Sequence, residues 1–432
     1  MNKKILRLAI PNIVSNLSVP LLSSVDTAMM GRMESEIYIG AIALGALIFN
    51  FVYWSFGFLR MGTTGLTAQA FGEKNDAKLM QILGRALVFA FGSGLILLVA
   101  QFFLSNIGFS ILDGSEAVEN LAKEYFSIRI WAAPATLCLY AMMGFFFGMQ
   151  NSVVPMVLTI IINIINLISN IVLVQYFGMK ADGVALGTVI AQYTGFMVSL
   201  VIFYKQYGYL LVHFQRKAIF EIQAFKKFLS LNGDIFIRTF LLVFVFSFFE
   251  NQSAAQSNLI LAINSILLQF VSWISYGIDG FAFASESLVG RYAGAKNQEK
   301  LRKAINLSFV WGFSLAILYS LTFFFFDEPL LRLFTNQENL ISATKDYTIW
   351  IVLFPILATA GYMWDGVFIG LTASKAMRNT MIWAFIFYMI LFYIVDYQVI
   401  EMTNFLLWLT FSLFIGIRGI VQTIYYRLYL KN

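Results

Sequence analysis

Long apolar segments separated by short polar loops dominate this chain and constrain its fold more than any other feature. A helix needs about 20 predominantly apolar residues to cross the hydrocarbon core of a bilayer. The sequence therefore predicts an all-α polytopic membrane protein with twelve transmembrane helices. Their expected positions are 10–30, 39–62, 85–107, 122–149, 154–175, 184–204, 230–250, 257–288, 304–326, 343–370, 380–400 and 404–426.

Composition excludes most soluble and catalytic classes. The chain is 59% hydrophobic and 12% charged, whereas soluble domains carry about a quarter charged residues. One cysteine (Cys138) and one histidine (His213) exclude a disulfide framework and cysteine-rich or multi-histidine metal sites. Phosphate-binding loops and hydrolase motifs are absent from the sequence. We therefore expect no enzyme, cofactor or bound metal, and a proton or sodium gradient as the energy source.

The distribution of basic residues predicts the orientation in the membrane. Lysines and arginines gather at both termini and in loops 72–85, 205–229, 290–303 and 371–379, while the alternate loops are acidic or neutral. The positive-inside rule then places both termini in the cytoplasm. A multi-pass protein of the inner (plasma) membrane is expected, as a monomer in the lipid bilayer. The net charge of +6 reflects these loops, and no basic stripe interleaved with aromatic residues suggests a nucleic-acid partner.

The two halves of the sequence resemble each other. Two pairs of segments recur at offsets of 219 to 222 residues: Phe51–Trp54 with Gly72–Asn75 as Phe270–Trp273 with Gly294–Asn297, and Pro134 with Gly144–Gly148 as Pro355 with Gly366–Gly370. Each copy contains six expected spans, and an even number makes both copies point the same way. This predicts a parallel pseudo-two-fold repeat, an arrangement typical of transporters.

The repeat also predicts the domain boundaries. We expect an N-terminal six-helix bundle at 1–204, a cytoplasmic linker at 205–229 and a C-terminal six-helix bundle at 230–432. Within the linker, Gln215–Leu229 alternates apolar residues with lysines, which favours a short helix in the membrane interface. A solvated linker is the alternative.

Asp26 is the clearest candidate for a functional group. It lies deep in the first expected span, six residues after Pro20, and an ionisable residue there costs about 2.5–3.5 kcal/mol on insertion scales. Such an acid can take up a proton from one side and release it on the other. Deprotonated, it can hold a sodium ion or a cationic drug. The alternative is an acid at the outer helix end that reaches water.

Three amides follow helical spacing in the fifth expected span. Asn163, Asn166 and Asn170 are spaced i, i+3, i+7, which places them on one helix face. Amides facing lipid would lack hydrogen-bond partners, so the face should point into the bundle. Interhelical hydrogen bonding with no role in transport is the alternative.

The second half carries its own buried charges. Asp279 and Glu286 are seven residues apart and share one helix face, and Asp365 lies in the tenth expected span. These acids are candidates for coupling or for an internal network with Arg238 or Arg418. One coupling cycle needs only one or two acids, so some of them should be structural.

An adaptable apolar cavity is a further expectation. Flexible thioethers and aromatic rings suit promiscuous binding surfaces, and ordinary packing is the alternative for each of them. The candidate lining residues are Met29, Met30, Trp54, Tyr140 and Met143.

Several segments together resemble one family, multidrug and toxic compound extrusion (MATE), and in detail its DNA-damage-inducible (DinF-like) branch. The resemblance extends from residue 8 to residue 380. The matching segments are Leu8–Pro11, Val19–Ala28, Gly183–Gln192, Asp234–Thr239, Asp279–Ala282 with Glu286, and Asp365–Gly370 with Met377–Thr380.

This resemblance implies two six-helix bundles in a V and transport by alternating access. It also implies export of small drug-like, often cationic, compounds in exchange for protons or sodium. The family's first-helix aspartate falls on Asp26. Its fifth-helix pattern of asparagine and acid falls on Asn166 and Asn170, where an amide replaces the acid. One remaining carboxylate favours proton coupling, because sodium prefers several oxygen ligands, although amide oxygens could still serve.

The leading hypothesis is a proton-coupled (or sodium-coupled) secondary antiporter that exports cationic amphipathic compounds. Asp26 would couple the ion, with Asn166 and Asn170 as its hydrogen-bonding partners. A flippase for lipid-linked intermediates is the main alternative, and it should line its cleft with arginines that pair a pyrophosphate. The candidate arginines Arg60 and Arg238, with Arg418, lie nearer the cytoplasmic ends. A receptor or channel is a further alternative, against which the repeat argues.

Overall fold

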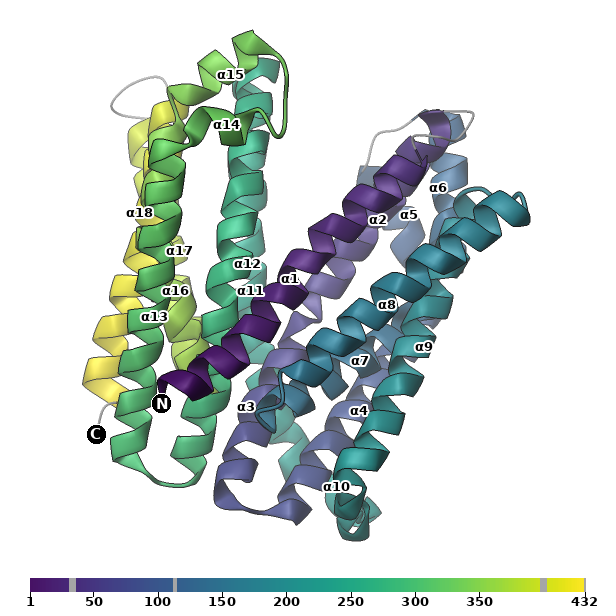
Figure 1. The fold of residues 1–432 in the computed structure, drawn as a ribbon, viewed down its shortest axis with the longest axis vertical. Coiled ribbons are helices and arrows are strands. Elements are labelled where there is room, and N and C mark those ends of the chain that lie inside the picture. The colour runs from purple at the N-terminus through teal and green to yellow at the C-terminus, as the bar shows by residue number, and fades with distance from the viewer. Residues whose placement is uncertain (31–35, 112–114, 397–401, 431–432) are drawn as a thin grey trace. The chain divides into compact units, whose positions relative to one another are not determined.

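Helices account for nearly all of the structure (Figure 1), a computed structural model that describes residues 1–30, 36–111, 115–396 and 402–430. No strand occurs in these residues. The longer helices are α1 (Asn2–Met30), α2 (Glu36–Ser55), α3 (Gly57–Glu73), α4 (Asp76–Val99), α5 (Gln101–Ile111), α6 (Glu116–Arg129), α7 (Ala133–Gly148), α8 (Val153–Ile171), α9 (Ala181–Tyr207), α11 (Ile222–Gln256), α12 (Asn258–Gly294), α13 (Gln298–Phe325), α16 (Thr348–Gly370), α17 (Ser374–Ile394) and α18 (Asn404–Tyr425). Short helices are α10 (Arg216–Ile219), α14 (Asp327–Leu331) and α15 (Glu338–Lys345), with η1 (Ile130–Ala132), η2 (Val172–Tyr176), η3 (Gly208–His213) and η5 (Tyr426–Leu430).

The predicted spans fall on these helices. Eleven helical segments among the described residues are long and apolar enough to cross a membrane, and they correspond in order to the second through twelfth expected spans. The first expected span lies in α1, whose side chains are described only as far as residue 18. The all-α polytopic fold is therefore confirmed. The observed ends differ from the expected ones by several residues: α12 continues to Gly294, whereas α16 begins at Thr348 and α17 ends at Ile394.

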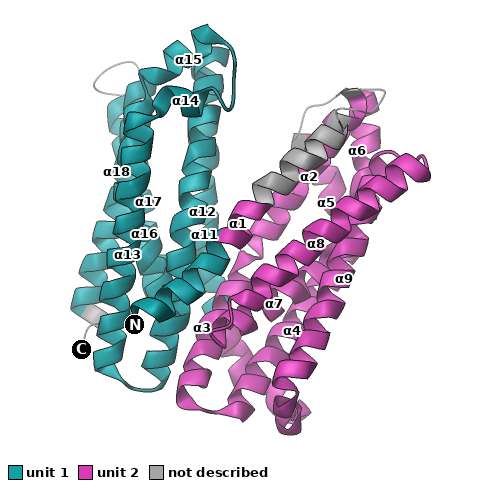
Figure 2. Cartoon of the chain, viewed as in Figure 1, with its two compact units in different colours: residues 1–13, 230–432 teal, residues 14–229 magenta. Residues whose placement is uncertain are grey.

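The chain separates into two compact units (Figure 2). Unit 2 contains residues 14–229, and unit 1 contains residues 1–13 together with 230–432. The break at 229/230 coincides with the expected end of the linker. Residues 1–13 instead join unit 1, where Lys4 Nζ lies 3.4 Å from Tyr292 Oη and Trp311 Nε1 donates to Asn2 Oδ1 at 3.3 Å. The polar start of the chain thus gains partners on α12 and α13.

The backbone shows the internal repeat directly. Four described non-glycine residues have a positive φ: Lys74 (56°), Gln150 (60°), Lys296 (52°) and Thr372 (53°). The two lysines, like the other two residues, are separated by the larger of the offsets seen in the sequence. Asn75 N donates to Ala70 O at 3.1 Å, and Asn297 N donates to Tyr292 O at 3.0 Å. Each unit therefore closes its corresponding helices with the same left-handed turn.

The segment after α9 differs from its predicted form. The expected helix at 215–229 is divided into the single turn of α10 and the beginning of α11, which runs on from Ile222 into the next span. Arg85 on α4 explains the break, because its Nε donates to Ile219 O at 3.1 Å and its Nη2 to Ala218 O at 2.7 Å. The last carbonyls of α10 are thereby satisfied by a side chain rather than by a further turn.

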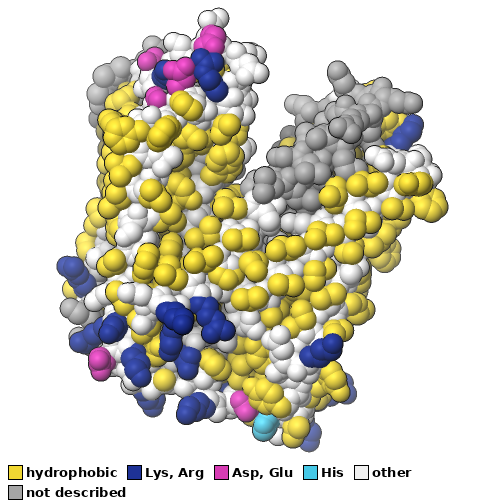
Figure 3. All heavy atoms as spheres, in the orientation of Figure 1, with side chains coloured by type: hydrophobic (Ala, Val, Ile, Leu, Met, Phe, Trp, Pro, Cys, Tyr) yellow, Lys and Arg dark blue, Asp and Glu magenta, His cyan; other side chains and the backbone are white. Residues whose placement is uncertain are grey.

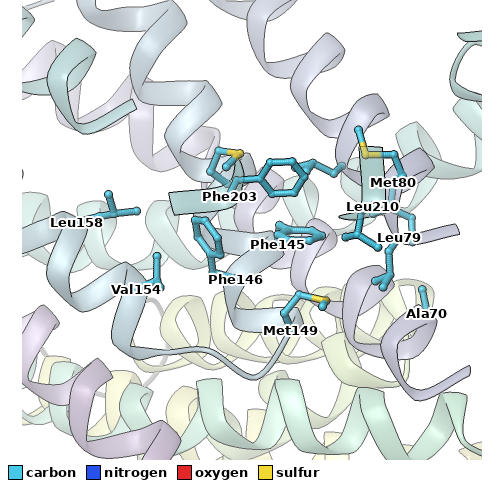
Figure 4. Packing of buried hydrophobic residues seen from close by; sticks show 13 residues of the cluster. Ala70, Leu79, Met80, Phe145, Phe146, Met149, Val154, Leu158, Phe203 and Leu210 are labelled. Atoms are coloured by element: carbon cyan, nitrogen blue, oxygen red, sulfur yellow. The ribbon is translucent and has the colours of Figure 1, made fainter. Parts of the chain in front are cut away.

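An aromatic core fixes α7 within unit 2 (Figure 4). Phe145 and Phe146 are fully buried with Met149 against residues of α4 and α9. The rings of Phe145 and Phe203 meet edge to face, with centroids 5.6 Å apart and an interplanar angle of 70°. Such aromatic pairs add specific geometry to apolar burial, so α7 is held in a defined position.

The surface matches a protein that spans a membrane (Figure 3). Apolar side chains cover the middle of the helices on the face shown, and basic side chains gather at the end of unit 1 that holds both termini. The opposite end of unit 1 carries mixed charges over α14 and α15. Large apolar side chains such as Phe102 (80% exposed) and Tyr176 (83%) would be costly in water, and they suit a lipid environment.

Candidate functional site

The predicted site residues fall into two groups, one in each unit. Unit 2 contains the amides of α8 and most of the expected cavity residues, and unit 1 contains the buried charges. Asp26, Met29 and Met30 belong to α1, but their side chains lie outside the described part of the structure. Their proposed roles stay predictions.

The amides of α8 hydrogen-bond to neighbouring helices. Asn166 and Asn170 are buried; Asn170 Nδ2 donates to Asn166 Oδ1 at 3.3 Å, and Asn166 Nδ2 donates to Thr188 Oγ1 on α9 at 3.2 Å. Asn163 Nδ2 donates to Ser18 Oγ on α1 at 3.3 Å. The amide face therefore points into unit 2, as its spacing predicts. Ser18 lies about two helical turns before Asp26 on α1.

The expected cavity residues have different surroundings. Tyr140 and Met143 lie on α7, and Met143 packs against the apolar clusters that α7 forms with α8 and α9. Tyr140 lies within electrostatic range of Arg60 and Arg129. Trp54, on α2, is 58% exposed. Met143 thus has the packing role that was the alternative for each of these residues, while Tyr140 belongs to a polar region.

Asp365 is the centre of a buried ionic network in unit 1. Its Oδ2 accepts hydrogen bonds from Arg238 on α11 and Arg418 on α18, and its Oδ1 accepts from Gln422 Nε2 at 2.8 Å. All four side chains are buried. Asp365 and Arg238 both belong to the predicted secondary network, and here they contact each other directly. Gln422 is an additional member. Gln422 follows Arg418 by one helical turn, so a search of that helix face could have found it.

Helix α12 contributes a second layer around this network. Asp279 lies within electrostatic range of Arg238 and Arg418. Tyr362 Oη lies 2.6 Å from Ser275 Oγ, and the Arg418 guanidinium carbon lies 5.7 Å from the Tyr362 ring centroid. Two arginines therefore face two acids, and the charges balance. Glu286 is buried two turns further along α12, and its membership of this network stays a prediction.

A second ion pair joins α11 to α17. Arg378 Nη1 lies 2.6 Å from Asp234 Oδ1, and Ser374 Oγ donates to Asp234 Oδ2 at 2.9 Å. Asp234 and Arg238 are one helical turn apart, and each pairs with a different helix. Three segments that are far apart in the sequence are thus joined by ion pairs: the segment with Asp234 and Arg238 pairs with Arg378 and with Asp365.

This geometry limits the chemistry of unit 1. A carboxylate that accepts hydrogen bonds from two guanidinium groups is held as their counter-ion, and removing it would leave uncompensated buried charge. Asp365 is therefore poorly placed to carry a proton or to bind a cationic substrate. Among the described residues, no group of three or more His, Cys, Asp or Glu side chains is arranged to hold a metal ion.

One partly buried arginine was missed by sequence reasoning. Arg129 ends α6 in the interior of the helical span Glu116–Gly148. Its Nη1 donates to Tyr125 Oη at 2.6 Å, and its guanidinium carbon lies 4.7 Å from the Phe49 ring centroid. The sequence could have indicated it, because Arg129 is a charged residue inside the predicted apolar span 122–149.

Comparisons with known proteins agree with this architecture. A family model described as MatE matches residues 11–172 and 235–397. DNA damage-inducible protein F of Escherichia coli (strain K12) is 32% identical over 431 residues, covering 100% of this chain and 93% of that protein. Probable multidrug resistance protein NorM of Bacillus cereus is 23% identical, covering 82% and 79% of the respective chains.

Solved structures share the fold at lower sequence identity. The eukaryotic MATE transporter AtDTX14 has a TM-score of 0.86 at 18% identity, covering 100% of this chain and 96% of its own. A MOP superfamily transporter from Pyrococcus furiosus has a TM-score of 0.85 at 17% identity, covering 99% and 95%. These structures support the helical architecture alone.

Proposed function

This chain belongs to the multidrug and toxic compound extrusion family, in its DinF-like branch, and from that premise we propose a secondary active antiporter that exports organic compounds by alternating access. The chain is a multi-pass membrane transporter and not an enzyme. The observation that carries the proposal is the family match across both halves of the chain. A parallel repeat of this kind suits a central substrate pathway.

The proposed substrates are small, amphipathic and cationic. The name of the NorM relative refers to multidrug resistance, and a carboxylate at Asp26 would attract a cation. The flippase alternative requires arginines that are available to a pyrophosphate. Arg238 and Arg418 bond to Asp365 instead, which weighs against that alternative.

The proposed coupling ion is a proton carried by Asp26, with sodium as the alternative ion. Asn166 Oδ1 already accepts from Asn170, and Asn166 Nδ2 donates to Thr188. The first contact occupies one amide oxygen, and sodium needs several oxygen ligands. In unit 1, Asp365 is neutralised by arginines, so proton exchange would rest on Asp26.

The proposed location is the inner (plasma) membrane, with both termini in the cytoplasm. We propose that the protein acts there as a monomer. Both termini belong to one end of unit 1, where basic side chains gather (Figures 1 and 3). Cysteines introduced at 212–216 should react with impermeant reagents only from the cytoplasmic side. Labelling from the outside would reverse this orientation.

Counterflow in proteoliposomes tests the transport proposal. A proton gradient and a sodium gradient are imposed one at a time, with the wild type and Asp26→Asn. We expect the proton gradient to drive export and Asp26→Asn to abolish it with the melting temperature unchanged, because asparagine resembles the protonated acid but cannot release a proton. Undiminished transport by Asp26→Asn would refute the coupling role of Asp26. Export driven by the sodium gradient and not by the proton gradient would make sodium the coupling ion.

Asp182→Asn is the matched control. The Asp182 carboxylate accepts a hydrogen bond from Lys180 N at 2.7 Å in the first turn of α9. The same isosteric change there should leave the export rate unaltered. An equal loss in both variants would mean that the transport assay reports folding rather than coupling.

A further inference from the structure

Arg129 is a partly buried cation on α6 of unit 2. It lies within a membrane-spanning segment, and among the described residues no carboxylate comes within ion-pair distance of it. Charged residues within membrane-spanning segments are costly and commonly mark substrate or ion pathways. The cost therefore needs a compensating partner.

The groups around Arg129 are neutral and leave part of the guanidinium unsatisfied. Among the described residues its one hydrogen bond goes to Tyr125 Oη at 2.6 Å, and its Nε is buried without an acceptor. The ring centroids of Phe49 and Tyr125 lie 4.7 and 5.5 Å from its guanidinium carbon. Cation–π contacts hold a guanidinium in place, but they leave its charge available to an anion.

The surrounding side chains add positive potential and hydroxyl groups. Arg129 interacts electrostatically with the hydroxyls of Tyr53 and Tyr140, and Arg60 interacts with that of Tyr140. The Tyr53 ring stacks on Phe49 with centroids 5.6 Å apart. Helices α2, α6 and α7 thus bring together a cation, two phenol hydroxyls and an aromatic surface. This combination suits a ligand with one acidic group and an apolar body.

In unit 1, buried arginines are paired with a carboxylate of the protein itself. There, Arg238 and Arg418 share the carboxylate of Asp365. Unit 2 has no equivalent carboxylate beside Arg129 in the part that the structure describes. We propose that Arg129 binds the carboxylate or sulfonate of an amphipathic substrate, whose apolar body lies against Phe49 and Tyr53. This inference rests on the proposed export function and extends its substrates to amphiphiles with an acidic group, including zwitterions whose cationic end Asp26 would attract.

Binding of two probes of opposite charge tests this subsite without any ion gradient. Anilinonaphthalene sulfonate and ethidium are both aromatic and fluorescent, and they differ in the sign of their charge. Their dissociation constants are measured on the full-length protein in detergent. Loss of a hydrogen-bonded charge pair corresponds to about tenfold or more in affinity. We expect Arg129→Gln to weaken sulfonate binding by about that factor and Arg129→Lys to retain much of it, with ethidium binding unchanged.

Two control variants separate binding from packing. Tyr125→Phe removes the hydrogen bond that orients the guanidinium but keeps its charge, so sulfonate binding should fall less than in Arg129→Gln. Arg85→Gln removes a buried arginine that bonds to the carbonyls of α10 and should leave the ratio of the two affinities unchanged. Melting temperatures identify any variant that is merely unfolded, and Arg129→Lys keeps the test decisive in that case.

Three outcomes would overturn the proposal. The first is an unchanged sulfonate affinity in a folded Arg129→Gln variant, and the second is an equal weakening of the binding of both probes. The third is displacement of the sulfonate by phosphatidylglycerol at equal concentration, which would assign the site to a lipid. The coupling proposal can fail separately, because Asp26→Asn is scored by gradient-driven transport and Arg129→Gln by binding at equilibrium.

Discussion

The helix crossings α3–α7 in unit 2 and α12–α16 in unit 1 share one backbone arrangement. They differ in the side chains beside the crossing, which are apolar in unit 2 and ionic in unit 1. A Cβ atom added at Gly144 would lie 2.5 Å from Arg60 O, and one added at Gly366 would lie 2.3 Å from Ala282 O. Both distances are too short for any residue except glycine. The residue before the glycine is Met143 in unit 2 and Asp365 in unit 1. The same close approach therefore supports an apolar contact in one unit and an ionic network in the other.

This difference shows that the repeat preserves backbone geometry rather than side-chain chemistry. In unit 1 the buried charges neutralise one another around Asp365. In unit 2 the buried polar groups are mainly hydroxyls and amides, together with Arg85, which bonds to backbone carbonyls. Arg129 is partly buried and has no carboxylate partner among the described residues. We infer that the charges around Asp365 and Asp234 are paired within unit 1, whereas the described part of unit 2 leaves Arg129 without a carboxylate partner.

The largest effect on stability should follow removal of the Asp365 charge. Asp365→Asn leaves Arg238 and Arg418 buried without their counter-ion, and breaking a buried pair in this way costs about 3–5 kcal/mol. The melting temperature in detergent should fall strongly. Met143→Leu at the corresponding position of unit 2 is the control, and a volume-conserving change there should cost less than about 1.5 kcal/mol. Equal effects would show that the two crossings do not differ electrostatically.

Intermediate effects should follow enlargement of the two glycines. Gly144→Ala and Gly366→Ala each force a methyl group against a backbone carbonyl, and overpacking of this kind costs about 1–3 kcal/mol. Because the two contact distances are nearly equal, we expect similar losses in thermal stability. A large loss in only one variant would show that the crossings tolerate separation differently. Gly57→Ala is a control, since a Cβ atom there has no neighbour within 4 Å.

Smaller effects should follow loss of an amide in unit 2. Asn166→Ala removes the hydrogen bonds to Asn170 and Thr188, and such interhelical bonds average about 0.6 kcal/mol, with a maximum of about 1.7 kcal/mol. Thermal stability should therefore decline only slightly. If proton-driven export nevertheless stops, Asn166 acts in coupling. If export and stability decline together and in proportion, the amide is structural.

The smallest effect should come from the exposed ion pairs of α14 and α15. Hydrogen bonds from Lys345 and Arg332 lower the pKa of Glu328, and hydrogen bonds from Arg332 lower the pKa of Glu338. Their contribution is complete above the unfolded glutamate pKa of about 4.3 and is lost as the pH falls through the lower folded values. The melting difference between the wild type and Glu328→Gln should therefore be slight at neutral pH and disappear in acid. A difference that grows in acid would contradict this sign.

The sequence predicted the helical architecture well because its apolar segments are long and lipid imposes one simple requirement on them. The parallel repeat could be read from short motifs, and the left-handed turns at Lys74 and Lys296 coincide with the repeated Lys-Asn pair. The break between α10 and α11 could not be predicted, because it depends on Arg85, which is distant in sequence.

The site was predicted less completely, because its partners come from separate helices. Helical spacing placed Asn166 and Asn170 on one interior face. Periodicity could not show that Asp365 pairs with Arg418 as well as Arg238, since that depends on how α11, α16 and α18 approach one another. Attention to acidic residues also concealed Arg129, whose aromatic surroundings come from separate helices.

The four left-handed turn residues have a practical consequence for handling this protein. Non-glycine residues in this conformation cost roughly 1–2 kcal/mol each, and glycine avoids most of that cost. Lys74, Gln150, Lys296 and Thr372 all lie just beyond helix ends, away from the proposed transport groups. Glycine at these positions offers a route to a more thermostable protein for crystallisation or cryo-microscopy, with its transport chemistry intact.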